Sequence, residues 1–150
     1  MMPFRREGND LVAAFTGPER ALLADLMDQL VGMLDDRTAD DPAIARLLPD
    51  AYPDDVEAAA EFRRFTEESL VDRKIANARA VRDSLGDGNV RLSPDQVQSW
   101  LRTATDTRLV LASRLGILQD DDEGTGDPFL SDVYNWLGYL QSSILEAMEG

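Results

Sequence analysis

Two capping boxes, each followed by an apolar stripe at helical spacing, constrain the fold of this chain more than any other feature. Thr16-Gly17-Pro18-Glu19 and Ser93-Pro94-Asp95-Gln96 each place a hydroxyl at an N-cap and an acceptor three residues later. The apolar positions that follow share one helix face. They are Leu22, Leu23, Leu26, Met27, Leu30, Met33 and Leu34 after the first box, and Val97, Trp100, Leu101, Ala104, Leu111, Ala112 and Leu115 after the second. We predict one helix ending at Asp35-Asp36 and another ending near Gly116.

Three further helices follow from start signals and periodicity. Asp41-Pro42 and Asp127-Pro128 each combine an N-cap residue with proline at the first helical position. The first starts a short helix over Ala43–Leu48, and the second starts the last helix of the chain. A long helix is predicted from about Asp54 to Leu85. The core face of the last helix comprises Leu130, Val133, Leu137, Leu140, Ile144 and Met148.

Short apolar runs predict a small amount of β-structure. Runs near Phe4 and at Leu11–Phe15 flank a Glu-Gly-Asn-Asp turn, which is typical of a hairpin. Val90–Leu92 is a third candidate strand. The length of 150 residues is that of one domain. The sequence therefore predicts a single mostly α domain over residues 1–150, a bundle of about five helices with one long central helix. It adds either an N-terminal hairpin or a three-stranded sheet from residues 3–15 and 89–92.

The long helix is apolar on two sides, which leaves two interpretations open. One side includes Val56, Leu70 and Val81, and the opposite side includes Phe62 and Phe65. Such a helix is either central in a monomer or packs on a partner as well as on its own core. The sequence is compatible with a central helix and with a homodimer face.

The absence of cysteine and histidine excludes several classes of function. No disulfide, thiolate nucleophile, thiol switch or cysteine zinc site is available, and no Ser-His-Asp triad can form. No cofactor or metal site is predicted; the acidic run Asp120–Glu123 does not match an EF-hand loop, which needs glycine at its sixth position. No stretch is apolar enough to span a membrane, and no signal peptide is evident. We expect a cytoplasmic protein that is not an enzyme.

The net charge of −14 disfavours direct binding to nucleic acid and favours a basic partner, although a merely solvated acidic surface is the simpler interpretation. Basic residues on the long helix are interleaved with acids, which is typical of a surface laced with ion pairs. The partner-binding residues suggested by the sequence are Phe62, Phe65, Arg79 and Arg82 on the long helix and Trp136 and Tyr139 on the last helix. Trp100 is expected in the core.

Arg108 is the most informative single residue because it falls within an apolar stripe. A buried unpaired charge is very costly, so the guanidinium must find a carboxylate or carbonyl groups. Glu61 and Glu67 on the long helix are the candidate partners in a buried ion pair. The alternatives are a guanidinium facing a cavity for an anionic ligand, or a side chain that extends to solvent.

Six short segments, in order along almost the whole chain, resemble an actinobacterial family of unknown function, the AosR-like proteins. The segments are Asp41–Ala43, Arg46–Tyr52, Glu61–Arg64, Asp106–Leu111, Arg114–Ile117 and Trp136–Gln141. The resemblance implies a cytoplasmic, non-enzymatic regulator of transcription under oxidative stress. It also implies a sigma factor as partner and a Cys-x-x-x-Cys pair as the oxidation switch. This chain has no cysteine, so that switch does not carry over.

The sequence therefore predicts a regulatory or adaptor protein that binds another protein. The alternative is a helical protein that binds a small anionic ligand through Arg108. The two are distinguished by whether Arg108 lines a pocket without a carboxylate in reach.

Overall fold

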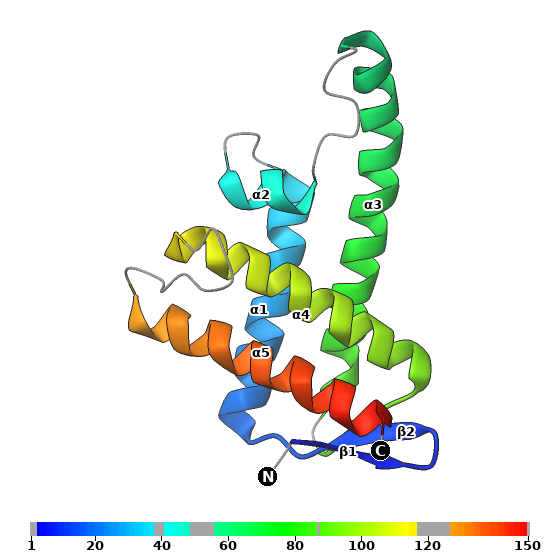
Figure 1. Cartoon of the computed structure of the whole chain (residues 1–150), viewed down its shortest axis with the longest axis vertical. Helices are drawn as coiled ribbons and strands as arrows, with labels where there is room; N and C mark the ends of the chain where they lie inside the picture. Colours follow the sequence, from blue (N-terminus) through cyan, green and yellow to red (C-terminus); the bar gives the residue numbers. More distant parts are fainter. Residues whose placement is uncertain (1–2, 38–40, 49–55, 87, 117–126, 150) are drawn as a thin grey trace.

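The computed structural model describes residues 3–37, 41–48, 56–86, 88–116 and 127–149, and side chains within these ranges except 56–65. Five helices and three strands are present in these ranges (Figure 1). The helices are α1 (Gly17–Asp36), α2 (Pro42–Leu47), α3 (Val56–Ser84), α4 (Pro94–Leu115) and α5 (Pro128–Glu149). The strands are β1 (Phe4–Glu7), β2 (Asp10–Ala13) and β3 (Val90–Leu92). The predicted mostly helical class is confirmed.

Both capping boxes form as predicted. Thr16 Oγ1 accepts a hydrogen bond from the Glu19 amide at 3.2 Å, and Glu19 accepts one from the Thr16 amide at 2.8 Å. Ser93 and Gln96 make the same reciprocal pair at the start of α4. These bonds satisfy amide groups that a helix start leaves without partners. At the other end of α4, Gly116 takes a left-handed conformation with φ of 73°, which glycine adopts without a steric cost.

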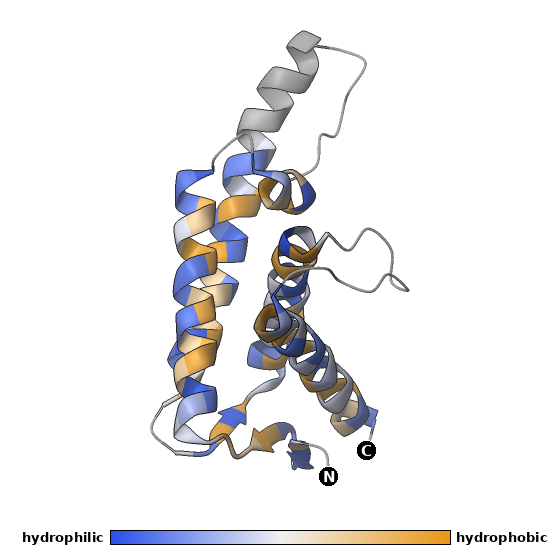
Figure 2. Ribbon diagram, turned by 90° about the vertical axis from the view of Figure 1, so that its left-hand side faces the viewer, coloured by the Kyte–Doolittle hydropathy of each residue, from blue (hydrophilic) through white to orange (hydrophobic). Residues whose placement is uncertain are grey.

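The helices pack in a chain of neighbours. α1 packs on α3, α3 packs on α4, and α4 packs on α5 and also on α2. Apolar residues recur as stripes along the helices (Figure 2). On α5, Val133, Leu137, Leu140 and Ile144 are buried as expected. Met148 is 42% exposed, so its predicted core position is wrong. Ala147 occupies the buried position in this last turn instead, because it lies seven residues after Leu140 on the same face of the helix.

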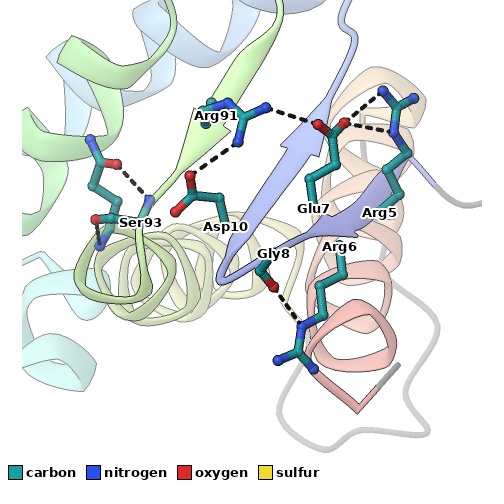
Figure 3. Close-up of polar contacts among 8 residues, drawn as sticks. Arg5, Arg6, Glu7, Gly8, Asp10, Arg91 and Ser93 are labelled. Atoms are coloured by element: carbon teal, nitrogen blue, oxygen red, sulfur yellow. Dashed lines mark hydrogen bonds and ion pairs between the residues drawn. The ribbon is translucent and has the colours of Figure 1, made fainter.

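The sheet has three antiparallel strands in the order β1-β2-β3, which settles the choice between hairpin and sheet. Phe4 lies opposite Ala13, and Val12 lies opposite Arg91. On the exposed surface, Arg91 of β3 donates to Asp10 at 3.0 Å and to Glu7 at 2.9 Å (Figure 3). Hydrogen bonds from Arg5 and Arg91 lower the pKa of the Glu7 carboxyl. The hairpin is thus tied to a strand more than 75 residues later.

An aromatic cluster joins the sheet to the helices. Phe15 stacks on Trp100 with ring centres 6.0 Å apart, and Phe4 meets both rings edge-on. Trp100 is only 3% exposed, which confirms its expected place in the core. Its indole N–H donates to Ser84 Oγ at 2.9 Å, so the buried polar atom is satisfied.

Candidate functional site

The outer edge of α5 forms a candidate contact surface next to the sheet. All four exposed large hydrophobic residues in the described part of the chain lie on this helix. They are Phe129, Tyr139, Leu145 and Met148. Exposed apolar side chains mark a binding surface where they are contiguous, and of these four residues Tyr139 is the one that lines a pocket. The sequence had singled out Tyr139 but not Leu145, which it left unassigned.

A pocket of about 360 Å³ opens beside Tyr139. Trp136 and Tyr139 form its α5 wall, and the start of the chain forms the opposite wall. The remaining lining residues are Pro3, Arg5, Ala14, Phe15 and Glu19. We call this feature the α5 groove. It combines aromatic surface with one cation and one carboxylate, and so offers both apolar and polar contacts to a ligand or a partner.

Trp136 is held in place by the aromatic cluster beneath it. Its ring meets Phe15 edge-on at 6.3 Å, a preferred arrangement for aromatic pairs. Phe15 in turn stacks on the buried Trp100. Trp136 is half-buried, whereas Tyr139, one turn later, is 44% exposed. The groove therefore has a rigid aromatic wall, a property that favours tight contact at low entropic cost.

Arg108 does not form the ion pair expected with Glu67. Its Nε donates to the Tyr134 carbonyl at 3.2 Å, and its Nη1 donates to Gln141 Oε1 at 3.3 Å. Its guanidinium carbon lies 4.2 Å from the centre of the Tyr134 ring. Glu67 instead pairs with Arg37 at 3.8 Å. The predicted pairing with Glu67 is wrong because Arg108 contacts Tyr134 and Gln141 of α5. The side chain of Glu61 lies outside the described residues.

The contact between Arg108 and α5 depends on a glycine. A Cβ added at Gly138 would lie 3.1 Å from the guanidinium carbon of Arg108, tighter than almost all real contacts. Glycine therefore lets the guanidinium lie flat against the helix between Tyr134 and Gln141. Arg108 lines neither the α5 groove nor the second pocket described below. It functions as a connection between α4 and α5.

Lys74 and Asp106 form the most buried ion pair among the residues that the structure describes, and sequence reasoning missed it. Lys74 Nζ lies 2.7 Å from Asp106 Oδ1, and the two side chains are only 17% and 10% exposed. Burial raises the pKa of the Asp106 carboxyl, although the hydrogen bond and charge of Lys74 act in the opposite direction. The available signal was that Lys74, the only lysine, interrupts an apolar side of the long helix.

The remaining predicted contact residues are not gathered at one place. Arg82 of α3 donates to Asp28 of α1 at 2.8 Å, and Arg79 is exposed on α3. Both lie on α3, whereas Trp136 and Tyr139 lie on α5, which packs against α4. Phe62 and Phe65 have side chains outside the described residues, so the homodimer face built on them stays a prediction.

Two negative findings concern only the ranges that the structure describes. No group of three or more acidic side chains is placed to hold a metal ion there. None of the helices in those ranges has the combined length and apolarity that a bilayer crossing requires.

Comparison with known proteins places the whole chain within one family. A family model described as "Domain of unknown function (DUF2017)" matches residues 1–148. The protein named "Oxidative stress regulator AosR" from Mycobacterium tuberculosis is 26% identical over 97% of this chain and 85% of its own length. The "Putative oxidative stress regulator AosR" from Mycobacterium leprae is 29% identical over 87% of this chain and 78% of its own length. No solved structure matches the chain.

Proposed function

The chain belongs to the DUF2017 family, and on that premise we propose that it is a regulatory protein that acts by binding another protein. Curated relatives that match almost the whole chain are named as oxidative stress regulators, which supports a regulatory role. The proposal is that this chain performs no catalysis of its own and works in the cytoplasm. The proposed partner is a sigma factor, as the family resemblance implies.

The observation that carries the binding surface is the α5 edge. The exposed large hydrophobic residues of the described chain lie on this helix, and the α5 groove presents Trp136 and Tyr139. Aromatic residues in a rigid setting are the usual anchors of protein interfaces. The acids on α5 are Asp132, Glu146 and Glu149, and the helix has no basic residue. The surface therefore suits a partner segment that combines apolar side chains with lysine or arginine.

The regulation must differ from a thiol switch. The chain contains no cysteine, so oxidation cannot form a disulfide within it. We propose that its binding to the partner is independent of the redox state of this chain. Control would then come from its abundance, from the partner, or from a ligand.

The test is direct binding between the full chain and each sigma factor of the host, measured by biolayer interferometry with purified proteins. We expect one sigma factor to bind with the same affinity in reductant and in a thiol oxidant, provided that the sigma factor itself is unchanged. Absence of binding to every sigma factor and to core RNA polymerase would contradict the proposed partner.

Matched variants locate the surface. Tyr139→Glu places a charge at the α5 groove, and we expect it to weaken binding at least tenfold. Leu145→Glu is the control, because Leu145 is 52% exposed on the same helix but does not line the groove. Equal thermal stability of the two variants would show that the difference is local. Loss of binding in Leu145→Glu alone would place the contact on the other side of α5.

A further inference from the structure

A second pocket lies between α3 and α4, away from the α5 groove. Its volume is about 390 Å³, within the range of pockets that hold small molecules. Arg73, Lys74 and Asn77 line it from α3, and Arg102, Thr105 and Asp106 line it from α4. We call it the α3–α4 pocket. Nothing in the proposed protein contact uses these residues.

The charge of this pocket is opposite to that of the chain. Three cationic side chains and one carboxylate line it, a formal excess of two positive charges. The whole chain carries a net charge of −14. Because charges of one sign are usually interspersed with the other on a protein surface, local reversal of the overall sign indicates a site for an oppositely charged ligand.

Two of the three cationic side chains in the α3–α4 pocket have no internal ion-pair partner among the described residues. The only carboxylate in the lining, Asp106, already receives Lys74. Arg73 and Arg102 are exposed, and neither has a hydrogen bond or ion pair with any part of the chain that the structure describes. By contrast, Arg82 on the same α3 helix is paired with Asp28. Among the described residues, two guanidinium groups are therefore without an internal partner at the pocket, one on each helix.

Lys74 adds a third positive charge, which the ion pair with Asp106 holds in place. An ammonium group has three N–H donors, and the bond to Asp106 Oδ1 at 2.7 Å uses one of them. Asp106 is anchored on α4 and thus positions the ammonium at the pocket. It is a positioning residue in this arrangement, because the ligand would meet Lys74 and the two arginines.

We propose that the α3–α4 pocket binds a small dianion, of which a phosphate monoester is the type. Two guanidinium forks and one ammonium match the oxygen atoms of a phosphate or of paired carboxylates. The formal excess of two positive charges in the lining balances such a ligand. This site is independent of the proposed protein contact, and a regulator without cysteine gains from it a ligand through which it senses the state of the cell.

The experiment is a titration of the ¹⁵N-labelled full chain, followed by amide chemical shifts. The probes are inorganic phosphate, glycerol 3-phosphate and succinate, each at constant ionic strength maintained with sodium chloride. We expect saturable shifts at amides of residues 70–77 and 101–106. Saturation by the phosphates alone would assign the site to phosphate, and saturation by succinate as well would assign it to dianions in general.

Arginine-to-glutamine variants inside and outside the pocket separate its contribution from general electrostatics. The double variant Arg73→Gln with Arg102→Gln should weaken phosphate binding at least tenfold. Arg79→Gln removes an exposed arginine from the same helix that does not line the pocket, and it should change the affinity less than twofold. These arginines are exposed, so the variants should fold. We avoid Lys74 here because its replacement would leave Asp106 buried without a cation.

Two results would overturn the proposal: shifts that fail to saturate at constant ionic strength, or equal weakening by Arg79→Gln and by the double variant. The test of the α3–α4 pocket can fail or succeed independently of the test of the proposed protein contact. Tyr139→Glu should leave dianion binding unchanged. The arginine double variant should leave binding to a sigma factor unchanged when no dianion is present.

Discussion

On one face of α4, Asp106 receives the ammonium of Lys74 from α3 at 2.7 Å. On the opposite face, two residues later, Arg108 reaches α5 and meets a carbonyl, an amide oxygen and an aromatic ring. The first contact joins two opposite charges, and the second satisfies one charge with neutral acceptors. The comparison shows that α4 is attached to its two neighbours by different physical means. The stability of the α3 contact should therefore require both charged residues. The stability of the α5 contact should require the space that Gly138 leaves for the guanidinium.

The strongest test of this difference is Lys74→Met. It leaves the Asp106 carboxylate in a buried position without its cation, and we expect a loss of about 3 kcal/mol in the free energy of unfolding. Chemical denaturation measures it. Arg82→Gln is the control, because the exposed pair with Asp28 should contribute no more than about 0.5 kcal/mol. Recovery of most of the loss in the double variant Lys74→Met with Asp106→Leu would support the account. Equal small losses in both single variants would contradict it.

The α5 side is tested by a double-mutant cycle on Arg108 and Gly138. Arg108→Ala removes two long hydrogen bonds and a cation–π contact, with an expected loss of about 1–2 kcal/mol. Gly138→Ala should gain about 1 kcal/mol from helix propensity, but only where Arg108 is absent, because the new Cβ would crowd the guanidinium. Denaturation of all four proteins gives the coupling energy. A gain of the same size in the presence of Arg108 would show that the guanidinium moves aside freely.

The smallest expected effect is a difference in how Asp41 and Asp106 make stability depend on pH. Arg114 and the Ala43 amide lower the pKa of Asp41 from 3.8 to about 2, so its stabilising contribution is complete above pH 3.8 and is lost as pH falls through about 2. The pKa of Asp106 is raised, so its folded form gains stability on protonation. As pH falls, we expect the difference in unfolding free energy between the wild type and Asp41→Asn to shrink. Over the same range, we expect the unfolding free energy of the wild type to rise relative to that of Asp106→Asn. Urea denaturation across pH 2–6 measures both. Parallel curves for the two variants would contradict the opposite signs.

Local signals predicted most of the fold. Both capping boxes set helix starts correctly, because an N-cap bond involves residues only three apart. The strand at Val90–Leu92 was expected, but only the structure shows that it pairs with β2 and not with β1. That choice depends on how α3 returns the chain to the hairpin, which no short motif encodes.

The sites were predicted less well, because they depend on contacts between helices. Lys74 and Asp106 are separated by 32 residues, and their meeting requires the packing of α3 on α4. Arg108 was recognised as unusual, but Glu67, one of its two predicted partners, pairs with Arg37 instead. The Gly138 next to Arg108 was the missing signal, since a helical glycine opposite a long side chain marks close approach. Trp136 and Tyr139 line one pocket, and their proximity could be expected because both lie on the same helix one turn apart; their role as contact residues stays a prediction.

The bond from the Phe4 amide to Ser143 Oγ has a consequence for synthesis of the chain. Phe4 leaves the ribosome well before Trp100 of α4 and Ser143 of α5, yet it is buried against both of these residues and pairs with β2. The edge of β2 that pairs with β3 likewise waits for residue 90. During translation the hairpin therefore exposes apolar side chains and an unpaired strand edge, both of which favour aggregation. β1 and β2 precede in the chain the elements that complete them, so the contacts of the hairpin with the core form only after α5 has emerged.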